Sequence, residues 1–289
     1  MQTLSAYAKI NWALNITGRR EDGYHLLDML MQTIDLCDDL AVEPADGLSL
    51  TVNGAPAGEE NLILRAANAL NRYAGSANGA RLSLTKRIPA QAGLGGGSAD
   101  CALALRALNG LWSLGLSNEE LLRLGERLGA DVPFCLTGGL ARVSGIGEHI
   151  AAVANAPEIP LVLVTPGGGL STAEVFSLWD GGGWPTVELD TRALAAAVVR
   201  RDLAEVDRLC ANALTAPALS LMPEIGELLE RLRALGAGAA FMTGSGSTVV
   251  GAFADIAAAR AAAERLPGAI LTKTLAELPR QALSNGNFA

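Results

Sequence analysis

The sequence predicts an α+β protein with two domains. Half of the 289 residues are apolar, which is enough to bury a sizeable core, and a chain of this length commonly divides in two. Both halves mix stretches in which polar and apolar residues alternate, as in strands, with stretches of helical spacing. The composition changes at residues 155–160, so we expect one domain over 1–155 and a second over 156–289.

The charge, the cysteines and the hydropathy argue against several classes of protein. A net charge of −8 disfavours a nucleic-acid-binding surface. The four cysteines match no zinc or redox motif, and two distant histidines do not suggest a histidine-rich metal site. No apolar run approaches the ~20 residues of a membrane span, and no signal or transit peptide precedes the first expected strand. We therefore expect a cytoplasmic protein.

The chain is expected to begin with a long strand, because polar and apolar residues alternate over 4–16. Lys9 and Asn11 then lie side by side on one face of this strand. Only three of the 22 basic residues are lysines, so Lys9 is a candidate functional residue, although a solvated strand face would also explain it.

A charged loop at 18–25 and a second strand at 29–42 come next. An Asp-Gly pair in the loop indicates a turn. From their local sequence alone, Tyr24 and His25 favour packing over ligand binding. The Asp-Asp pair at 38–39 is expected to interrupt the second strand.

The stretch Ala92-Gly93-Leu94-Gly95-Gly96-Gly97-Ser98-Ala99-Asp100 is the most informative motif. A strand is predicted before it, at 81–88, and a helix after it, at 99–112. Backbone N–H groups in a glycine turn that opens a helix bind phosphate, since they point at the ligand from the positive end of the helix dipole. A turn that needs glycine only for its φ angles is the alternative, but four glycines exceed that need. The stretch is not a Walker loop, because no Gly-Lys-Ser/Thr follows, and its spacing differs from the Rossmann fingerprint.

Capping residues and periodicity predict the remaining elements. Asn61 is expected to cap a helix that Gly75 ends, and Ser117 with Glu120 to open a leucine-rich helix that stops at Gly129. From the local sequence, Asp131 before Val-Pro favours a helix N-cap. The other expected elements are a strand at 49–53, a hairpin at 140–153, a strand at 161–165, a helix opened by a capping box of Ser171 and Glu174, three helical stretches over 191–235, strands at 239–243 and 249–254 around a Gly-Ser-Gly-Ser loop, and a helix followed by a strand at 269–272.

Together, these motifs resemble those of the GHMP kinases. A lysine strand, a Pro-x-x-x-Gly-Leu-Gly-Gly-Gly-Ser loop at 89–98 and the Gly-Ser-Gly-Ser loop at 244–247 occur in the order typical of that family. The blocks Ala8-Lys9-Ile10-Asn11, Gly18-Arg19-Arg20-x-Asp22-Gly23-Tyr24-His25, Leu128-Gly129-Ala130-Asp131-Val132-Pro133 and Thr243-Gly244-Ser245-Gly246 are similar to those of the members that phosphorylate a cytidine-diphosphate alcohol in the non-mevalonate isoprenoid pathway. The resemblance covers nearly the whole chain. It implies that the domain over 1–155 is like ribosomal protein S5, binds ATP and carries catalysis. The domain over 156–289 would be ferredoxin-like and bind the substrate, with the site between the two domains.

The resemblance also implies roles for individual residues. Asp131 would be the general base for the substrate's 2-hydroxyl, and Lys9 would orient it and stabilise the developing charge. These roles suit phosphoryl transfer, which depends chiefly on positioning and charge neutralisation. Tyr24 and Phe176 would sandwich the cytosine ring while His25 reads its edge. The other implied contacts are Asn11, Thr172, Gly244 and Ser245 to the substrate, and Asn61, Lys86, Pro89, Ala90, Gln91, Ala92, Gly93, Leu94, Gly95, Gly96, Gly97, Ser98 and Ala99 to ATP.

The implied ligands are ATP with Mg²⁺, whose protein ligands the sequence leaves open, and a cytidine-diphosphate alcohol, with no nucleic-acid or membrane partner and a monomer or weak homodimer as the assembly. The sequence departs from some relatives, because Ala99 lacks a hydroxyl and Asp100 adds a carboxylate near the phosphates. Two alternatives stay open. One is a GHMP kinase for a sugar or amino-acid alcohol, and the other is a nucleotide- or RNA-binding module without catalysis.

Overall fold

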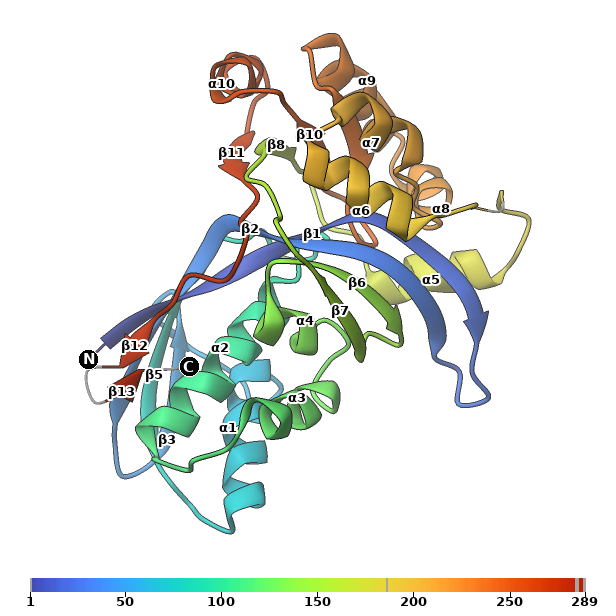
Figure 1. Ribbon diagram of the computed structural model, residues 1–289. Coiled ribbons are helices and arrows are strands. Elements are labelled where there is room, and N and C mark those ends of the chain that lie inside the picture. Colours follow the sequence, from blue (N-terminus) through green and yellow to red (C-terminus); the bar gives the residue numbers. More distant parts are fainter. Residues whose placement is uncertain (1, 186, 284–285, 288–289) are drawn as a thin grey trace.

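The structure is a computed structural model that describes residues 2–185, 187–283 and 286–287. Two main sheets are each covered by helices, and the first of them contains a long ribbon formed by β1 and β2 (Figure 1). The predicted α+β architecture is confirmed. In chain order the elements are β1 (Gln2–Arg19), β2 (His25–Pro44), β3 (Leu48–Val52), β4 (Ala55–Pro56), α1 (Leu62–Ala74), β5 (Ala80–Thr85), α2 (Gly96–Leu111), α3 (Asn118–Glu126), α4 (Val132–Thr137), β6 (Leu140–Gly145), β7 (His149–Val153), β8 (Pro160–Val164), α5 (Thr172–Asp180), α6 (Thr191–Arg200), α7 (Leu203–Leu209), α8 (Thr215–Leu221), α9 (Glu224–Ala234), β9 (Ala239–Met242), β10 (Val249–Ala252), α10 (Ile256–Ala263), β11 (Ile270–Lys273), β12 (Ala282–Leu283) and β13 (Gly286–Asn287).

The strand β1 follows the predicted alternation and pairs antiparallel with β2 along almost its whole length. Its register shifts on both sides of Lys9, between Tyr7 and Lys9 and again between Asn11 and Ala13. Such bulges redirect the side chains of a strand. The two shifts therefore set the direction in which Lys9 leaves the ribbon.

The strand β2 runs without a break from His25 to Pro44, so the expected interruption at 38–39 is wrong. The Asp38 side chain is fully buried, and its carboxylate accepts hydrogen bonds from the backbone N–H groups of Arg87 and Ile88 and from the Lys86 ammonium. A buried carboxylate is tolerated inside a sheet when its oxygens are bonded in this way. The Asp-Asp pair at 38–39 therefore does not end the strand, and Asp38 links β2 to the segment that leads into the glycine loop.

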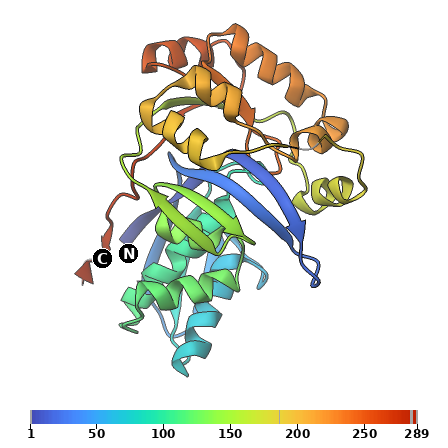
Figure 2. The ribbon, with the colours of Figure 1, turned by 45° about the vertical axis from the view of Figure 1, so that its right-hand side comes forward.

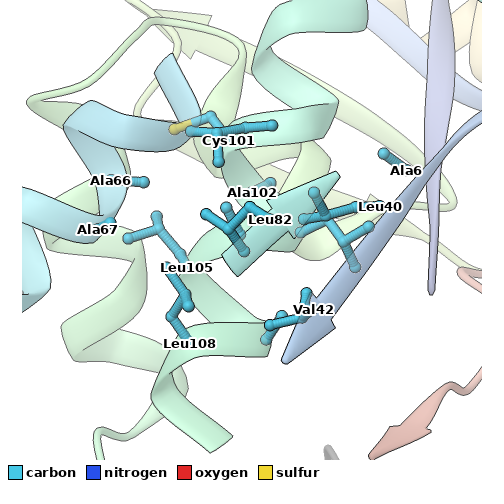
Figure 3. Packing of buried hydrophobic residues seen from close by; sticks show 14 of the residues in the cluster. Ala6, Leu40, Val42, Ala66, Ala67, Leu82, Cys101, Ala102, Leu105 and Leu108 are labelled. Carbon is cyan, nitrogen blue, oxygen red and sulfur yellow. The ribbon is translucent and has the colours of Figure 1, made fainter. Parts of the chain in front are cut away.

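The first core lies between the first sheet and helices α1–α4. The sheet has the order β4-β3-β5-β2-β6-β7, with β1 added beside β2. Figure 3 shows side chains from β2, β5 and α2 meeting in this core. Leu40, Leu82 and Leu105 are among its members, and each is at most 1% exposed. Helix α2 is thus fixed along its length, which holds the glycines at its N-terminus in place.

The second sheet is antiparallel, in the order β11-β8-β10-β9, and shares its core with the ribbon. Trp12 on β1 packs against Phe241 on β9 with ring centroids 5.1 Å apart. Leu14 exchanges backbone hydrogen bonds with the segment between α7 and α8, through the Ala211 carbonyl and the Ala213 N–H. The segment after β11, residues 274–281, returns to the first sheet, where the Gln281 side chain bonds the backbone of β1.

Several predicted boundaries shift. The strand expected to reach residue 88 ends at Thr85, helix α2 already begins within the glycines at Gly96, and α3 ends at Glu126 rather than near residue 129. Four helices, not three, fill 191–234. The capping box of Ser117 and Glu120 is confirmed. The expected box of Ser171 and Glu174 is half formed, because the Ser171 side chain accepts from the Glu174 N–H without the reciprocal bond. Within the described residues, no helix combines the length and apolarity needed to span a membrane.

Candidate active site

A cleft of about 740 Å³ is lined by residues of both halves of the chain. Its walls come from β1, from the start of β2, from the glycine loop with the first turn of α2, from α5 and from the loop between β9 and β10. Every residue predicted to bind or react lines it except Ala99. Figure 2 shows α5 beside the end of the β1–β2 ribbon that carries Tyr24 and His25. Segments more than 200 residues apart in sequence thus meet at one cleft.

The glycine loop packs tightly against the Gly-Ser-Gly-Ser loop. Gly93 has a φ of +75°, and a Cβ on it would lie 2.2 Å from the carbonyl oxygen of Thr243. Glycine is therefore required for this approach. Helix α2 has Gly95 as its N-cap with no side-chain cap, so the first N–H groups of the helix are left to the cleft among the described residues. This arrangement suits an anion such as phosphate.

Lys9 joins three parts of the site. Its ammonium Nζ donates to Asn11 Oδ1 at 2.6 Å and to the Gly93 carbonyl oxygen at 3.1 Å, and lies 3.3 Å from Asp131 Oδ2. The residue is only 4% exposed, and its own backbone N–H donates to the Leu94 carbonyl. A cation with this many bonds is held in one position between the loop and the carboxylate.

Asp131 occupies the position before α4 that its local sequence predicts, but its side chain does not cap the helix. The carboxylate points instead to Lys9, and its side chain is 29% exposed. The N-cap interpretation is therefore wrong for the side chain. An accessible carboxylate beside a fixed ammonium can accept a proton from a nearby hydroxyl.

Comparisons with known proteins agree with this geometry. The family model of the GHMP kinases N terminal domain matches residues 61–139, and that of the GHMP kinases C terminal domain matches residues 194–270. The 4-diphosphocytidyl-2-C-methyl-D-erythritol kinase of Pelotomaculum thermopropionicum is 45% identical over 91% of this chain and 93% of its own, and that of Moorella thermoacetica is 43% identical over 94% and 99%. The chain belongs to the 4-diphosphocytidyl-2-C-methyl-D-erythritol kinases of the GHMP superfamily. It is therefore an ATP-dependent phosphotransferase.

Solved structures support the same assignment. The crystal structure of 4-(cytidine 5'-diphospho)-2C-methyl-D-erythritol kinase superposes with a TM-score of 0.80 and 38% identity, covering 94% of this chain and 99% of that one. The homoserine kinase of Cytophaga hutchinsonii superposes with a TM-score of 0.69 at 17% identity, covering 96% and 97%. The second match shows the shared fold alone. The predicted two-domain GHMP kinase fold is confirmed.

Beside the glycine loop of this kinase, Lys86 bridges two buried carboxylates. Its ammonium contacts Asp38 and lies 2.8 Å from Asp100 Oδ2. Burial raises the pKa of Asp100 to about 7, although Lys86 opposes the shift. Burial also acts to lower the pKa of Lys86, but the two carboxylates outweigh it and the net shift is upward. Asp100 therefore binds Lys86 rather than standing free near the phosphates.

Ala99 is buried, 3% exposed, and faces a different cavity of about 640 Å³ on the other side of α2, together with Tyr7 and Arg106. Its backbone N–H donates to the Gly95 carbonyl as part of the helix. A hydroxyl at this position would point into that second cavity. The side chain of Ala99 thus has no part in the cleft.

In the part of the cleft lined by α5, the His25 ring stacks on Phe176, with centroids 4.7 Å apart and an interplanar angle of 32°. Tyr24 stands beside them and is 60% exposed. Thr172 and Ser245 share a hydrogen bond of 2.8 Å between their hydroxyl groups. The aromatic residues are thus gathered where α5 meets the start of β2.

Sequence reasoning missed several residues of the site. Asp180 forms a hydrogen bond with His25, and the Trp179 ring meets the His25 ring edge-on, with ring centroids 5.7 Å apart. Only a helical period through Phe176 could have suggested this, since positions 176, 179 and 180 share a helix face. The cleft also has apolar walls, which no sequence motif predicted. They are made of Leu14, Leu27, Met29, Val52, Leu62, Leu84, Ile146 and Leu214.

Proposed function

We propose that this kinase transfers the terminal phosphoryl group of ATP to the 2-hydroxyl of 4-diphosphocytidyl-2-C-methyl-D-erythritol, an intermediate of the non-mevalonate isoprenoid pathway. The names of the relatives support the substrate. The observation that carries the mechanism is the position of Lys9, whose ammonium contacts the glycine loop through Gly93 and the carboxylate of Asp131 at the same time. One cation therefore links the phosphate-binding loop to the candidate base.

In this mechanism Asp131 is the general base. Its oxygen accepts the proton of the substrate hydroxyl as the hydroxyl oxygen attacks phosphorus, and the phosphate of ADP leaves on the opposite side. Lys9 holds the carboxylate in place and offsets the negative charge that develops on the transferring group. Its burial supports this role, because a fixed charge loses no energy by reorganising during the reaction.

The glycine loop and the first turn of α2 would hold the ATP phosphates, with Asn61 and Lys86 toward the adenine. The described residues contain no group of three or more His, Cys, Asp or Glu side chains suited to a metal. This fits Mg²⁺ in kinases, which is bound through one or two side chains together with substrate phosphates. Ser98 lines the cleft and would supply a hydroxyl oxygen. When bound, the ion would neutralise phosphate charge.

The aromatic end of the cleft would bind the cytosine. Tyr24 is exposed and free to close on a ring that enters beside Phe176, while His25 would read the edge of the base. Asn11, Thr172, Gly244 and Ser245 would contact the rest of the substrate. Because the base lies far from the reacting hydroxyl, its binding energy can be used to position the alcohol.

Steady-state kinetics with three alcohols test this proposal: the cytidine substrate, its uridine analogue, and methylerythritol phosphate without a base. We expect the uridine analogue to be at least about tenfold less efficient, since mismatched polar groups are left unpaired, and the base-free alcohol to lose turnover as well as affinity. Tyr24→Ala and Phe176→Ala should be less than additive if both pack on one ring. Equal efficiency on all three alcohols would contradict the cytosine pocket.

A further inference from the structure

The carboxylate of Asp180 holds the His25 ring from behind. Asp180 ends α5, and its Oδ1 lies 2.7 Å from Nε2 of His25. The second oxygen, Oδ2, lies 3.4 Å from Nη1 of Arg19. Phe176 stacks on the imidazole, and Trp179 meets it edge-on. Three residues of one helix therefore fix both the position and the rotation of this ring, although Asp180 is itself outside the lining of the cleft.

This contact determines which ring nitrogen carries the proton. An ionised carboxylate only accepts hydrogen bonds, so Nε2 of His25 must donate its hydrogen to Asp180. In a neutral imidazole the other nitrogen, Nδ1, then has a lone pair and can only accept. Among the described residues, Nδ1 has no hydrogen-bond partner. His25 therefore offers the cleft an acceptor.

An acceptor at this position distinguishes the two pyrimidine bases. Cytosine has an exocyclic amino group that donates, whereas uracil has a carbonyl oxygen that accepts at the same position. We propose that Asp180 is a positioning residue that selects cytosine over uracil by holding His25 in the tautomer with hydrogen on Nε2. This inference rests on the proposed function, in which His25 reads the base. The simpler explanation is an ion pair at a helix end with no effect on specificity.

Three variants separate the two explanations. In Asp180→Asn, Arg19 is a pure donor and draws the amide oxygen toward itself, so the amide NH₂ faces His25. Nε2 must then accept a hydrogen bond from the amide, so the hydrogen of the ring moves to Nδ1. His25 would thus present a donor to the cleft in place of an acceptor. Asp180→Ala removes the contact without imposing the reversed tautomer. Asp180→Glu keeps a carboxylate and serves as the conservative control.

The first measurement is the nitrogen-15 NMR spectrum of the imidazoles in the free enzyme. The chain has only two histidines, so His149, whose side chain is 73% exposed, is an internal reference that no variant should change. We expect His25 to have its hydrogen on Nε2 in the wild type and on Nδ1 in Asp180→Asn. A wild-type His25 with its hydrogen on Nδ1 would overturn the inference without any variant.

The second measurement is the ratio of kcat/KM for the cytidine substrate to kcat/KM for the uridine analogue. We expect it to be highest in the wild type, close to that in Asp180→Glu, lower in Asp180→Ala, and lower by about tenfold or more in Asp180→Asn. Wild-type discrimination with an unchanged ratio in Asp180→Asn would refute the role of Asp180 and leave the proposed function standing. A wild type that does not discriminate would refute the proposed cytosine pocket itself.

Discussion

Replacing Gly95 by alanine should displace Lys9 and slow the reaction by more than the strained backbone alone explains. Gly95 has a φ of +69°, and a Cβ there would lie 2.9 Å from both Cγ and Cε of Lys9. Ordinary carbon contacts lie near 3.5–4.0 Å, so the lysine side chain must withdraw by about 1 Å. That movement opposes the bonds of its ammonium to Asn11 and Asp131. A misplacement of this size costs about 100-fold in turnover, and alanine at positive φ costs about 1–2 kcal/mol of stability.

Gly115 provides a matched control, because it also has a φ of +69° but a Cβ on it would meet no described atom within 4 Å. Gly115→Ala should lose similar stability, seen as a melting temperature lowered by a few degrees, and keep full turnover. Thermal melts with steady-state kinetics on both variants make the comparison. Wild-type turnover in Gly95→Ala, or an equal loss in both variants, would refute the claim that this glycine exists to make room for Lys9.

Two further predictions concern charged side chains. Lys9→Arg should lose most activity although the charge is kept, because a planar, forked guanidinium cannot replace a compact ammonium between the loop and the carboxylate. Lys273→Arg is the control, since Lys273 forms an exposed pair with Glu158, and it should stay active. Equal rates in the two variants would contradict the role of Lys9. The pKa of Asp100 is raised to about 7 in the folded chain, whereas an unfolded aspartate releases its proton near pH 4. Between pH 4 and 7 the folded chain therefore holds one proton more than the unfolded chain, and the stability that this group contributes is lost as the pH rises. Urea unfolding should show Asp100→Asn gaining on the wild type by about 1 kcal/mol per pH unit between pH 4 and 7, and a pH-independent difference would show that Asp100 is ionised throughout.

Local rules predicted the elements whose stabilising contacts are local. The alternation in β1, the Asn61 and Gly75 caps of α1 and the Ser117 capping box each depend on a few neighbouring residues, and the structure has all of them. The uninterrupted course of β2 could not be predicted in this way. Asp38 remains inside the strand because Lys86 and the following backbone, almost 50 residues later, satisfy its carboxylate.

The site shows the same division. The glycine loop and the pairing of Lys9 with Asp131 followed from motifs and the family resemblance. Local sequence favoured Asp131 as a cap, and only its contact with β1 shows that the carboxylate turns away from the helix. Asp180 belongs to none of the motifs. Local sequence could not predict its role, because its partner His25 lies 155 residues earlier in the chain.

The most direct test of the account is the single-turnover rate of phosphoryl transfer in Asp131→Asn with ATP and the cytidine substrate already bound. The substitution is nearly isosteric, and because the Asp131 side chain caps no helix, no capping stability should be lost. We expect the rate to fall by about 100-fold or more while calorimetry shows unchanged ATP affinity. A folded Asp131→Asn variant that transfers phosphate at a rate near that of the wild type would contradict the assignment of Asp131 as the base.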